Sequence, residues 1–287
     1  MGVVSAPARP AGRSGDLRAV PVAARAAGSN LLVLQPARVR SPEAIDEVAA
    51  LRPDVGVLAD YGQIVPQALL DLAPHGMLNL HPSLLPRHRG ATPIPEAILA
   101  GDARTGVSLF RMDAGLDSGP VIAVATLALS GSETAPELET ALSGLAAGLL
   151  IRSLGPWLRA ELPARPQPVE GVTVSRPLRR ADGGLDPRES AIELERHVRA
   201  YLGWPGSFLE TGLGRLVILR ASIGPPVERP AGTLVAAGSG LALATGDGSL
   251  VLDEVQLAGR RPMSGADLRR GRPAIVGAPV VNPSAGR

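Results

Sequence analysis

Three short apolar runs in the first part of the chain have the length and composition of buried strands. They occupy residues 31–35, 55–59 and 76–81. A polar segment with helical spacing separates the first two, and Ser41 followed by Pro42 is a strong helix start. Strands that alternate with helices at short spacing are typical of parallel βαβ units. The pattern therefore predicts an α/β domain.

The same domain continues through two more predicted strands and one long helix. The strands lie at residues 106–112 and 121–129, and the helix spans residues 134–160. The stretch at residues 161–177 is rich in proline and has neither helical nor strand periodicity. We interpret it as an interdomain linker, which places the first domain at residues 1–160.

Beyond the linker, the pattern changes to short strands divided by glycine turns. Ser190 and Glu193 form a capping box that opens one amphipathic helix. Short strands with closely spaced turns are typical of a small β-barrel, which we place at residues 178–287. Its predicted strands are residues 208–212, 215–222, 232–238, 241–248 and 249–259.

Composition narrows the possible chemistry. The chain has no cysteine, and all 29 of its basic residues are arginine. These absences exclude disulfides, thiolate metal sites, cysteine nucleophiles, Schiff-base lysines and P-loop lysines. The four histidines show no metal-ligand spacing, so we predict no metal site. We expect His197, beside Arg196 and Arg199 in the predicted helix, to be exposed.

Charge and hydropathy indicate the compartment and the kind of partner. The net charge is +2, and the isoelectric point of 9.8 reflects the exclusive use of arginine, which is compatible with nucleic-acid binding. No apolar stretch approaches the roughly 20 residues that a membrane-spanning helix needs. The first residues lack the apolar centre of a signal peptide. We therefore predict a cytoplasmic protein with no membrane partner, and we further expect it to be a monomer.

Polar residues at the end of the third predicted strand suggest a reactive site. Asn79 and His81 are two positions apart, so their side chains share one face of the strand. Open α/β folds place their sites at the carboxyl ends of parallel strands. Asp117 lies in a glycine-bounded turn between the next two predicted strands, which can bring its carboxylate beside the imidazole. These residues alone leave a purely structural role open.

The segments around these residues resemble a known signature. Asn79-Leu-His81 followed by SLLPRHRG, and then GLDSGP around Asp117, is similar to the motif of formyltetrahydrofolate-dependent formyltransferases. That family acts on methionyl-tRNA, glycinamide ribonucleotide or sugar nucleotides. The resemblance runs through nearly the whole chain, and the segments ARPAGRSG and ADYGQIVP and the C-terminal barrel favour the methionyl-tRNA branch.

The resemblance implies a fold, a reaction and a set of substrates. The fold is a Rossmann-like parallel-sheet formyltransferase domain followed by an OB-like barrel. The reaction moves the formyl group of 10-formyltetrahydrofolate to the amino group of methionyl-initiator tRNA, for translation initiation. Folate would lie against the loop of Ser83, Leu84, Leu85 and Pro86. The candidate tRNA contacts are Arg13, Arg179, Arg180, Arg260 and Arg261, with Arg269 and Arg270 as further candidates.

Physical chemistry assigns roles to the three matched residues. Attack of an amine on a formyl carbon produces a tetrahedral centre that carries an oxyanion. Asn79 and protonated His81 can each donate a hydrogen bond to that oxygen. Asp117 can orient His81, stabilise its cationic form and hold a water that relays the proton from the attacking amine.

Three departures from the family pattern bear on these expectations. Family members normally begin with an additional strand and helix, whereas Met1 falls at the start of the expected second strand, which would leave two strand edges open. Pro95 replaces a usual glutamine, and Asp60 replaces a usual small residue. Two alternatives therefore stay open: a sugar-nucleotide formyltransferase, and a catalytically inactive tRNA-binding relative.

Overall fold

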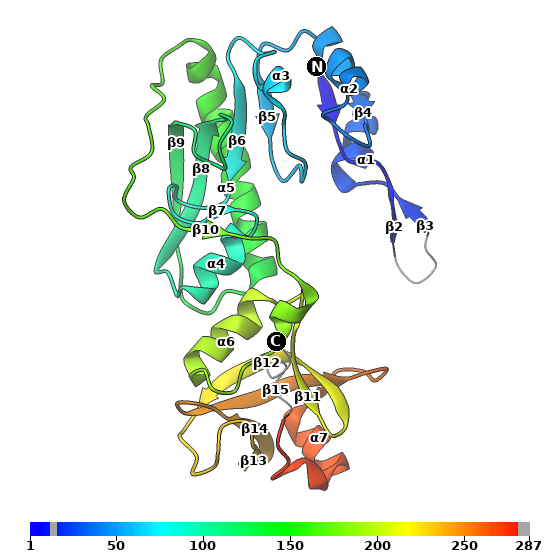
Figure 1. Cartoon of the computed structure of the whole chain (residues 1–287), viewed down its shortest axis with the longest axis vertical. Coiled ribbons are helices and arrows are strands. Elements are labelled where there is room, and N and C mark those ends of the chain that lie inside the picture. The colour runs from blue at the N-terminus through cyan, green and yellow to red at the C-terminus, as the bar shows by residue number, and fades with distance from the viewer. Residues whose placement is uncertain (12–15, 281–287) are drawn as a thin grey trace. The chain divides into compact units, whose positions relative to one another are not determined.

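The computed structural model describes residues 1–11 and 16–280, and the chain divides into two compact units. One unit comprises residues 1–89, 106–125 and 145–172, and the other comprises residues 90–105, 126–144 and 173–287. Figure 1 shows the order of the elements along the chain. Both units combine helices with sheets, so the predicted α/β class is confirmed.

The N-terminal segment forms a small parallel pair of strands covered by helices. Strand β1 (Gly2–Val4) pairs with β4 (Leu32–Leu34). The chain between them forms the hairpin of β2 (Arg9–Ala11) and β3 (Asp16–Arg18), followed by helix α1 (Pro21–Ala27). Helix α2 (Pro42–Ala50) starts as predicted, because the Ser41 side chain accepts from the backbone N–H of Ala44. Within the described residues, β1 pairs with β4 only.

A second sheet carries the polar residues that the sequence singled out. Its order is β5 (Gly56–Leu58), β6 (Met77–His81), β8 (Arg104–Arg111) and β9 (Val121–Ala128), and α3 (Gln67–Leu70) connects the first two. The β5–β6 pair is parallel, whereas β8 runs antiparallel to β6. The sheet is therefore mixed, because alternation of elements along the chain does not fix the direction in which each strand enters. Within the described residues, β5 pairs on one side only.

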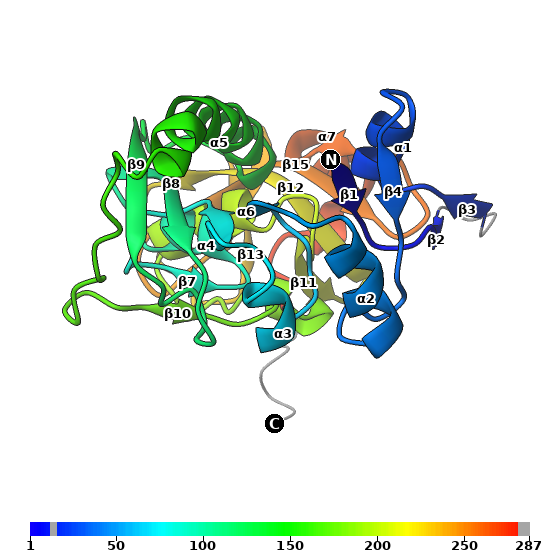
Figure 2. The same cartoon turned by 90° about the horizontal axis from the view of Figure 1, so that it is seen from above.

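Helix α5 (Ala135–Leu158) lies beside β8 and β9 in both views (Figures 1 and 2). A stripe of Leu138, Leu142 and Leu149 is buried, whereas Ile151 is 79% exposed. Contrary to our expectation, this 24-residue helix is long and apolar enough, by length and composition, to cross a membrane. A core helix of a soluble protein passes the same test, so a single helix of this kind is weak evidence for a membrane-spanning segment.

The C-terminal unit is built on an antiparallel sheet. Its strands pair in the order β11 (Ser207–Thr211), β12 (Gly214–Gly224), β15 (Ser249–Leu257), β14 (Gly240–Ala244) and β13 (Leu234–Ala237), and β16 (Met263–Ser264) pairs with β15. Helix α6 (Ala191–Ala200) packs against β12, and α7 (Gly265–Gly271) packs against β14 and β15. This agrees with the sheet-rich C-terminal domain that the sequence predicts. The described ladders run as an open path from β11 to β13.

The remaining elements are short. They are α4 (Pro93–Leu99), the bridge between β7 (Arg89–Gly90) and β10 (Val174–Ser175), and the 3-10 turns η1 (Arg180–Gly183) and η2 (Pro273–Ile275). Pro95 lies in the first turn of α4, where a proline is tolerated. Asp60, in the other unit, has a left-handed φ of 47°, which the short polar side chain of aspartate tolerates well.

The capping box of α6 is present as predicted, but its histidine differs from expectation. Ser190 accepts from the N–H of Glu193, whose carboxylate accepts from the N–H of Ser190. His197 is partly buried rather than exposed: its Nε2 donates to the backbone oxygen of Asp182 (2.9 Å), and its Nδ1 contacts the hydroxyl of Ser207 (3.0 Å). The prediction failed because the neighbouring arginines indicate the polarity of the helix, not the direction of this one side chain.

Candidate active site

Strand β6 separates its apolar side chains from its polar ones. Leu78 and Leu80 enter the core, at 0% and 9% exposure, while Asn79 and His81 project from the other face of the strand. The Asn79 side-chain amide has no hydrogen-bond partner among the described residues. It is therefore available to bind a substrate group.

The His81 ring is held at both nitrogens. Its Nε2 lies 2.8 Å from the backbone oxygen of His88, and its Nδ1 lies 3.7 Å from Oδ2 of Asp117. A carbonyl oxygen only accepts, so the neutral ring carries its proton on Nε2. Nδ1 then presents a lone pair on the side of the carboxylate. Because Nε2 is already bonded to the His88 oxygen, the expected donation from protonated His81 to an oxyanion would come from Nδ1.

The two loops that hold the ring have unusual backbone conformations. His88 has a φ of 57° and Asp117 a φ of 48°, both in the left-handed region. Non-glycine residues occupy that region rarely and at a cost in free energy, and such residues cluster at functional sites. Asn79 and His81 thus lie at the end of strand β6, and Asp117 lies in a strained turn.

Burial and charge act on His81 in opposite directions. Burial of the ring lowers its pKa below the ordinary value, and the nearby charge of His88 adds to that effect. The Asp117 carboxylate and the hydrogen bond to the His88 carbonyl raise the pKa of His81 but do not outweigh burial. The imidazole is therefore mainly neutral at neutral pH, and a proton arriving at Nδ1 would face a carboxylate.

The predicted folate loop follows β6 directly and is tied to β8. Ser83 is fully buried, and its hydroxyl donates to the backbone oxygen of Arg87 at 2.6 Å. The Ser108 hydroxyl donates to the oxygen of Ser83 (2.8 Å) and accepts from the N–H of Leu85 (3.1 Å). Ser83 thus shapes the loop, while Leu84, Leu85 and Pro86 remain partly accessible.

The structure also brings Gln167 to the site, which sequence reasoning missed. Its Nε2 donates to the backbone oxygens of Asp117 and Gly119, and its Oε1 accepts from Arg89. Gln167 lies in the proline-rich stretch that we interpreted only as a linker. Gln167 is one of several polar residues in that stretch, and the sequence does not indicate which of them meets the Asp117 turn.

The candidate RNA contacts separate into accessible and engaged arginines. Arg179, Arg180, Arg260 and Arg261 are exposed, and Arg13 lies outside the described residues. By contrast, Arg269 donates to the backbone oxygens of Gly238 and Gly240, and Arg270 pairs with Asp267.

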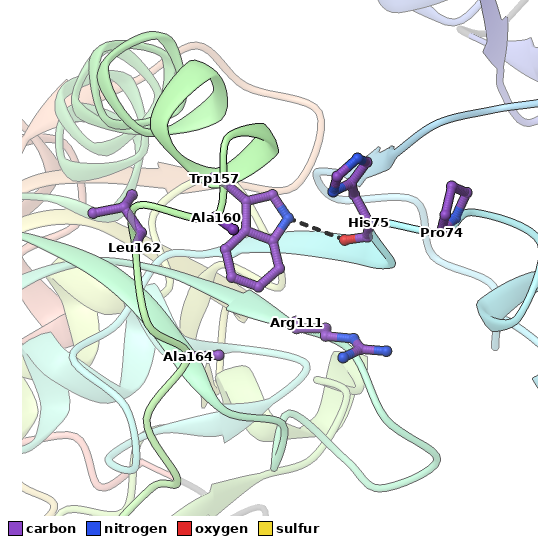
Figure 3. A pocket seen from close by; sticks show the side chains of 7 residues that line it. All are labelled: Pro74, His75, Arg111, Trp157, Ala160, Leu162 and Ala164. Carbon is purple, nitrogen blue, oxygen red and sulfur yellow. Dashed lines mark hydrogen bonds between the residues drawn. The ribbon is translucent and has the colours of Figure 1, made fainter.

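Two cavities lie apart from these residues. One, of about 280 Å³, is lined by Pro74, His75, Arg111, Trp157, Ala160, Leu162 and Ala164 (Figure 3). In it, Trp157 Nε1 donates to the backbone oxygen of His75 at 3.0 Å. The other, of about 590 Å³, is lined by residues between 33 and 47. Neither is lined by Asn79, His81 or Asp117, so we do not assign the chemistry to them.

Across residues 1–11 and 16–280, no group of three or more His, Asp or Glu side chains is arranged to hold a metal ion. The groups that the structure gathers at the candidate site are the amide of Asn79, the imidazole of His81 and the carboxylate of Asp117.

Comparison with known proteins agrees with this fold. Residues 1–154 match the family described as Formyl transferase, and residues 177–273 match the family described as Formyl transferase, C-terminal domain. These matches assign the chain to the formyl transferases.

The relatives identify the branch. The methionyl-tRNA formyltransferase of Myxococcus xanthus is 42% identical over 270 residues, which cover 94% of this chain and 86% of that protein. The chain belongs to the methionyl-tRNA formyltransferase family.

Two solved structures share the fold. The methionyl-tRNA formyltransferase from Clostridium thermocellum has a TM-score of 0.56 at 18% identity, over 78% of this chain and 93% of that one. HypX from Aquifex aeolicus in complex with tetrahydrofolic acid has a TM-score of 0.62 at 18% identity, over 94% of this chain and 47% of that one.

Proposed function

We propose that the chain transfers the formyl group of 10-formyltetrahydrofolate to the amino group of methionyl-initiator tRNA, at a centre formed by Asn79, His81 and Asp117. One observation carries this proposal. The Asn79 amide, which has no partner among residues 1–11 and 16–280, projects from the same strand face as an imidazole whose Nδ1 lies 3.7 Å from a carboxylate. This is the set of groups that acyl transfer to an amine requires: an oxyanion donor and a proton acceptor with a stabilising charge.

The reaction forms one bond and breaks one bond. The amine nitrogen of the methionyl group attacks the formyl carbon, and the carbonyl oxygen becomes an oxyanion to which the Asn79 amide donates. The amine then loses a proton to a water beside Asp117 and His81 Nδ1. Collapse of the tetrahedral centre breaks the bond between the formyl carbon and N10 of the folate, and the relayed proton ends on N10.

The loop after β6 is suited to hold the folate. Ser83 fixes the loop from inside, so the exposed parts of Leu84, Leu85 and Pro86 offer an apolar surface next to the strand end. A pterin ring needs such a surface, together with a few polar groups that orient it. HypX, which shares this fold, is in complex with tetrahydrofolic acid, which supports a folate co-substrate.

The C-terminal part supplies the candidate RNA contacts. We propose residues 1–160 as the catalytic domain, 161–177 as the linker and 178–287 as the tRNA-binding domain. The exposed guanidinium groups of Arg179, Arg180, Arg260 and Arg261 match the planar geometry of phosphate, and Arg13 is proposed to reach the acceptor end. We further propose that the protein acts as a monomer in the cytoplasm, without a membrane partner.

The test is direct formylation. The chain is mixed with methionyl-initiator tRNA and 10-formyltetrahydrofolate, and formyl-methionyl-tRNA is measured, with Asp117→Asn as the control. Product that is lost in the control supports the reaction and the site together. Formylation of a sugar-nucleotide amine without formyl-methionyl-tRNA would assign the chain to the sugar enzymes. Binding of the tRNA without any product would indicate an inactive binder.

A further inference from the structure

Gln167 uses both ends of its side-chain amide to join two loops. Its Nε2 donates to the backbone oxygens of Asp117 (2.7 Å) and Gly119 (2.8 Å). Its Oε1 accepts from Nε (3.1 Å) and Nη2 (2.7 Å) of Arg89. An amide has two N–H donors and two acceptor lone pairs, so its hydrogen-bonding capacity is filled.

The two loops joined by Gln167 are the loops that contact the His81 ring. Arg89 directly follows His88, whose backbone oxygen accepts from His81 Nε2 at 2.8 Å. Asp117 faces His81 Nδ1 at 3.7 Å. The Gln167 side chain therefore links the loop of His88, which contacts Nε2 of His81, to the turn of Asp117, which faces Nδ1. Because His88 and Asp117 both have left-handed backbone conformations, each of them needs surroundings that hold it in place.

The segment that carries Gln167 is itself fixed. Arg165 and Val121 exchange two backbone hydrogen bonds, each with an N···O distance of 2.8 Å. Val121 is the first residue of β9 and directly follows the turn that carries Asp117. Pro166 and Pro168 flank Gln167 and restrict the backbone on either side. The amide is thus presented from a rigid stretch, not from a loose linker.

We propose that Gln167 is a positioning residue that sets the placement of the Asp117 carboxylate relative to His81 for formyl transfer. The inference rests on the proposed function. Gln167 makes no contact with the reacting groups themselves, because it acts through the backbone oxygens of Asp117 and Gly119 and through Arg89. Its loss would let the Asp117 turn and the His88 loop move independently.

The test uses Gln167→Met, which keeps the length of the side chain but removes its N–H donors. We expect kcat to fall by ~10–10²-fold, as expected for a misplaced catalytic group, with the KM values for tRNA and folate unchanged. The pKa of His81, followed by NMR of its ring protons, should also fall. Asp117 raises that pKa and His88 lowers it, so a retreating carboxylate removes the raising influence.

Two further variants keep the result interpretable. Gln167→Glu retains an acceptor for Arg89 but loses both donors to the Asp117 turn, so it should also lose kcat. Glu170→Gln changes an exposed residue of the same stretch and should behave as wild type. Wild-type kcat and an unshifted His81 titration in Gln167→Met would overturn the proposal. Absence of product from the wild type would instead overturn the proposed function, while the NMR readout still tests the positioning.

A separate observation concerns the C-terminal unit, where an indole lies on the surface beneath an arginine. Trp204 is 55% exposed, and the guanidinium carbon of Arg180 lies 5.7 Å from the centre of its ring. The nearby Asp182 carboxylate is bound by Arg176 at 2.6 and 2.7 Å, so it does not compete for Arg180. An exposed aromatic face beside an arginine is what nucleobases stack upon.

The turn that carries Trp204 is fixed against the segment that carries Arg180. The N–H of Gly206 donates to the oxygen of Tyr201 at 2.9 Å and closes the turn. A Cβ on Gly183, at the end of η1, would lie 1.9 Å from the oxygen of Gly206, so the two backbones meet without room for a side chain. The arrangement of Trp204 and Arg180 is therefore built into the backbone.

We infer that Trp204 and Arg180 form a stacking surface for a nucleobase of the tRNA, an inference that also rests on the proposed function. In a Trp157→Phe background, Trp204 is the sole tryptophan, because the chain has 2. Its fluorescence should be quenched on titration with tRNA. Trp204→Ala should raise the KM for tRNA by ~10-fold, which is within the range expected when the stacking of one base is lost. The same variant should leave the KM for folate unchanged. Trp204→Phe should restore most of that affinity.

Unquenched fluorescence, or a KM for tRNA that is unchanged in Trp204→Ala while the wild type still formylates, would overturn the stacking surface alone. A wild type that makes no product would overturn the proposed function, and quenching by tRNA would still test the surface.

Discussion

His81 Nδ1 lies 3.7 Å from Asp117 Oδ2, while the other ring nitrogen is bonded to a backbone oxygen. This relationship makes the ring asymmetric. Nε2 keeps its proton because its partner is a backbone oxygen, which accepts a hydrogen bond but does not take the proton. Only Nδ1 can therefore gain or lose a proton during a reaction. The carboxylate stands where the resulting positive charge would form. The site is therefore arranged for transient protonation of a buried and otherwise neutral imidazole.

Asp117→Asn should remove most of the activity without unfolding the protein. The amide keeps the size of the side chain but not its charge, so an imidazolium at His81 loses its stabilisation. We expect kcat for formyl transfer to fall by ~10²–10⁴-fold, the range for loss of acid–base assistance. Steady-state kinetics measures the fall, and the same variant should titrate His81 at a lower pH. An unchanged kcat would remove Asp117 from the mechanism.

Asn79→Ala tests the oxyanion donor. Because the Asn79 amide has no partner within the described residues, its removal should cost little stability. Its donation to the developing oxyanion should be worth ~10²–10³-fold in kcat. Thermal unfolding and steady-state kinetics on one preparation separate the two effects. A lower melting temperature with an unchanged kcat would indicate a structural asparagine.

The sequence could predict those parts of the fold and site that depend on local pattern. Ser41 and Ser190 cap their helices because each cap side chain and the backbone N–H that donates to it lie within one turn of each other. Asn79 and His81 share a strand face because side chains alternate along a strand. In each case the relevant neighbours are a few positions apart, and their spacing determines which side chains meet.

What the sequence could not predict depends on chain segments that meet only in the folded protein. Gln167 contacts Arg89 across 78 positions and Asp117 across 50, and no local periodicity encodes either contact. The antiparallel entry of β8 and the burial of His197 have the same origin. The missed features are tertiary contacts of polar groups, which hydrophobic patterning does not report.

Stability should fall as the pH is lowered from about 6.5 to about 4 because of His197. Burial of its ring lowers the pKa of His197 from 6.5 to about 4, although Asp182 raises it. Between these values the unfolded chain binds a proton that the folded chain does not, so acid favours unfolding. The full effect approaches roughly 3 kcal/mol. Burial lowers the pKa of His81 too, in the same direction.

Urea unfolding at a series of pH values measures this dependence. His197→Gln should flatten the curve in that range. A His197→Gln curve as steep as that of the wild type would assign the acid sensitivity to other groups.

Arg260→Gln and Arg261→Gln should weaken tRNA binding through phosphate contacts alone. Each lost contact should reduce the slope of log affinity against log salt concentration by ~1. Arg270→Gln is the matched control, because Arg270 is already paired with Asp267. Binding titrations at several salt concentrations measure the slopes. Equal slopes in all three variants would place the tRNA surface elsewhere.

Gly119→Ala tests whether the turn that carries Asp117 must stay close to β8. A Cβ on Gly119 would lie 1.9 Å from the backbone oxygen of Arg111, a contact that no side-chain movement can relieve. The turn must therefore shift, and with it both the Asp117 carboxylate and a backbone oxygen bonded to Gln167. We expect loss of stability and a fall in kcat beyond that of any stability-matched variant. Gly144→Ala, on α5 with open space around the added methyl, should be neutral or stabilising in the same assays. If Gly119→Ala retains wild-type kcat in its folded fraction, the position of Asp117 does not depend on this close approach.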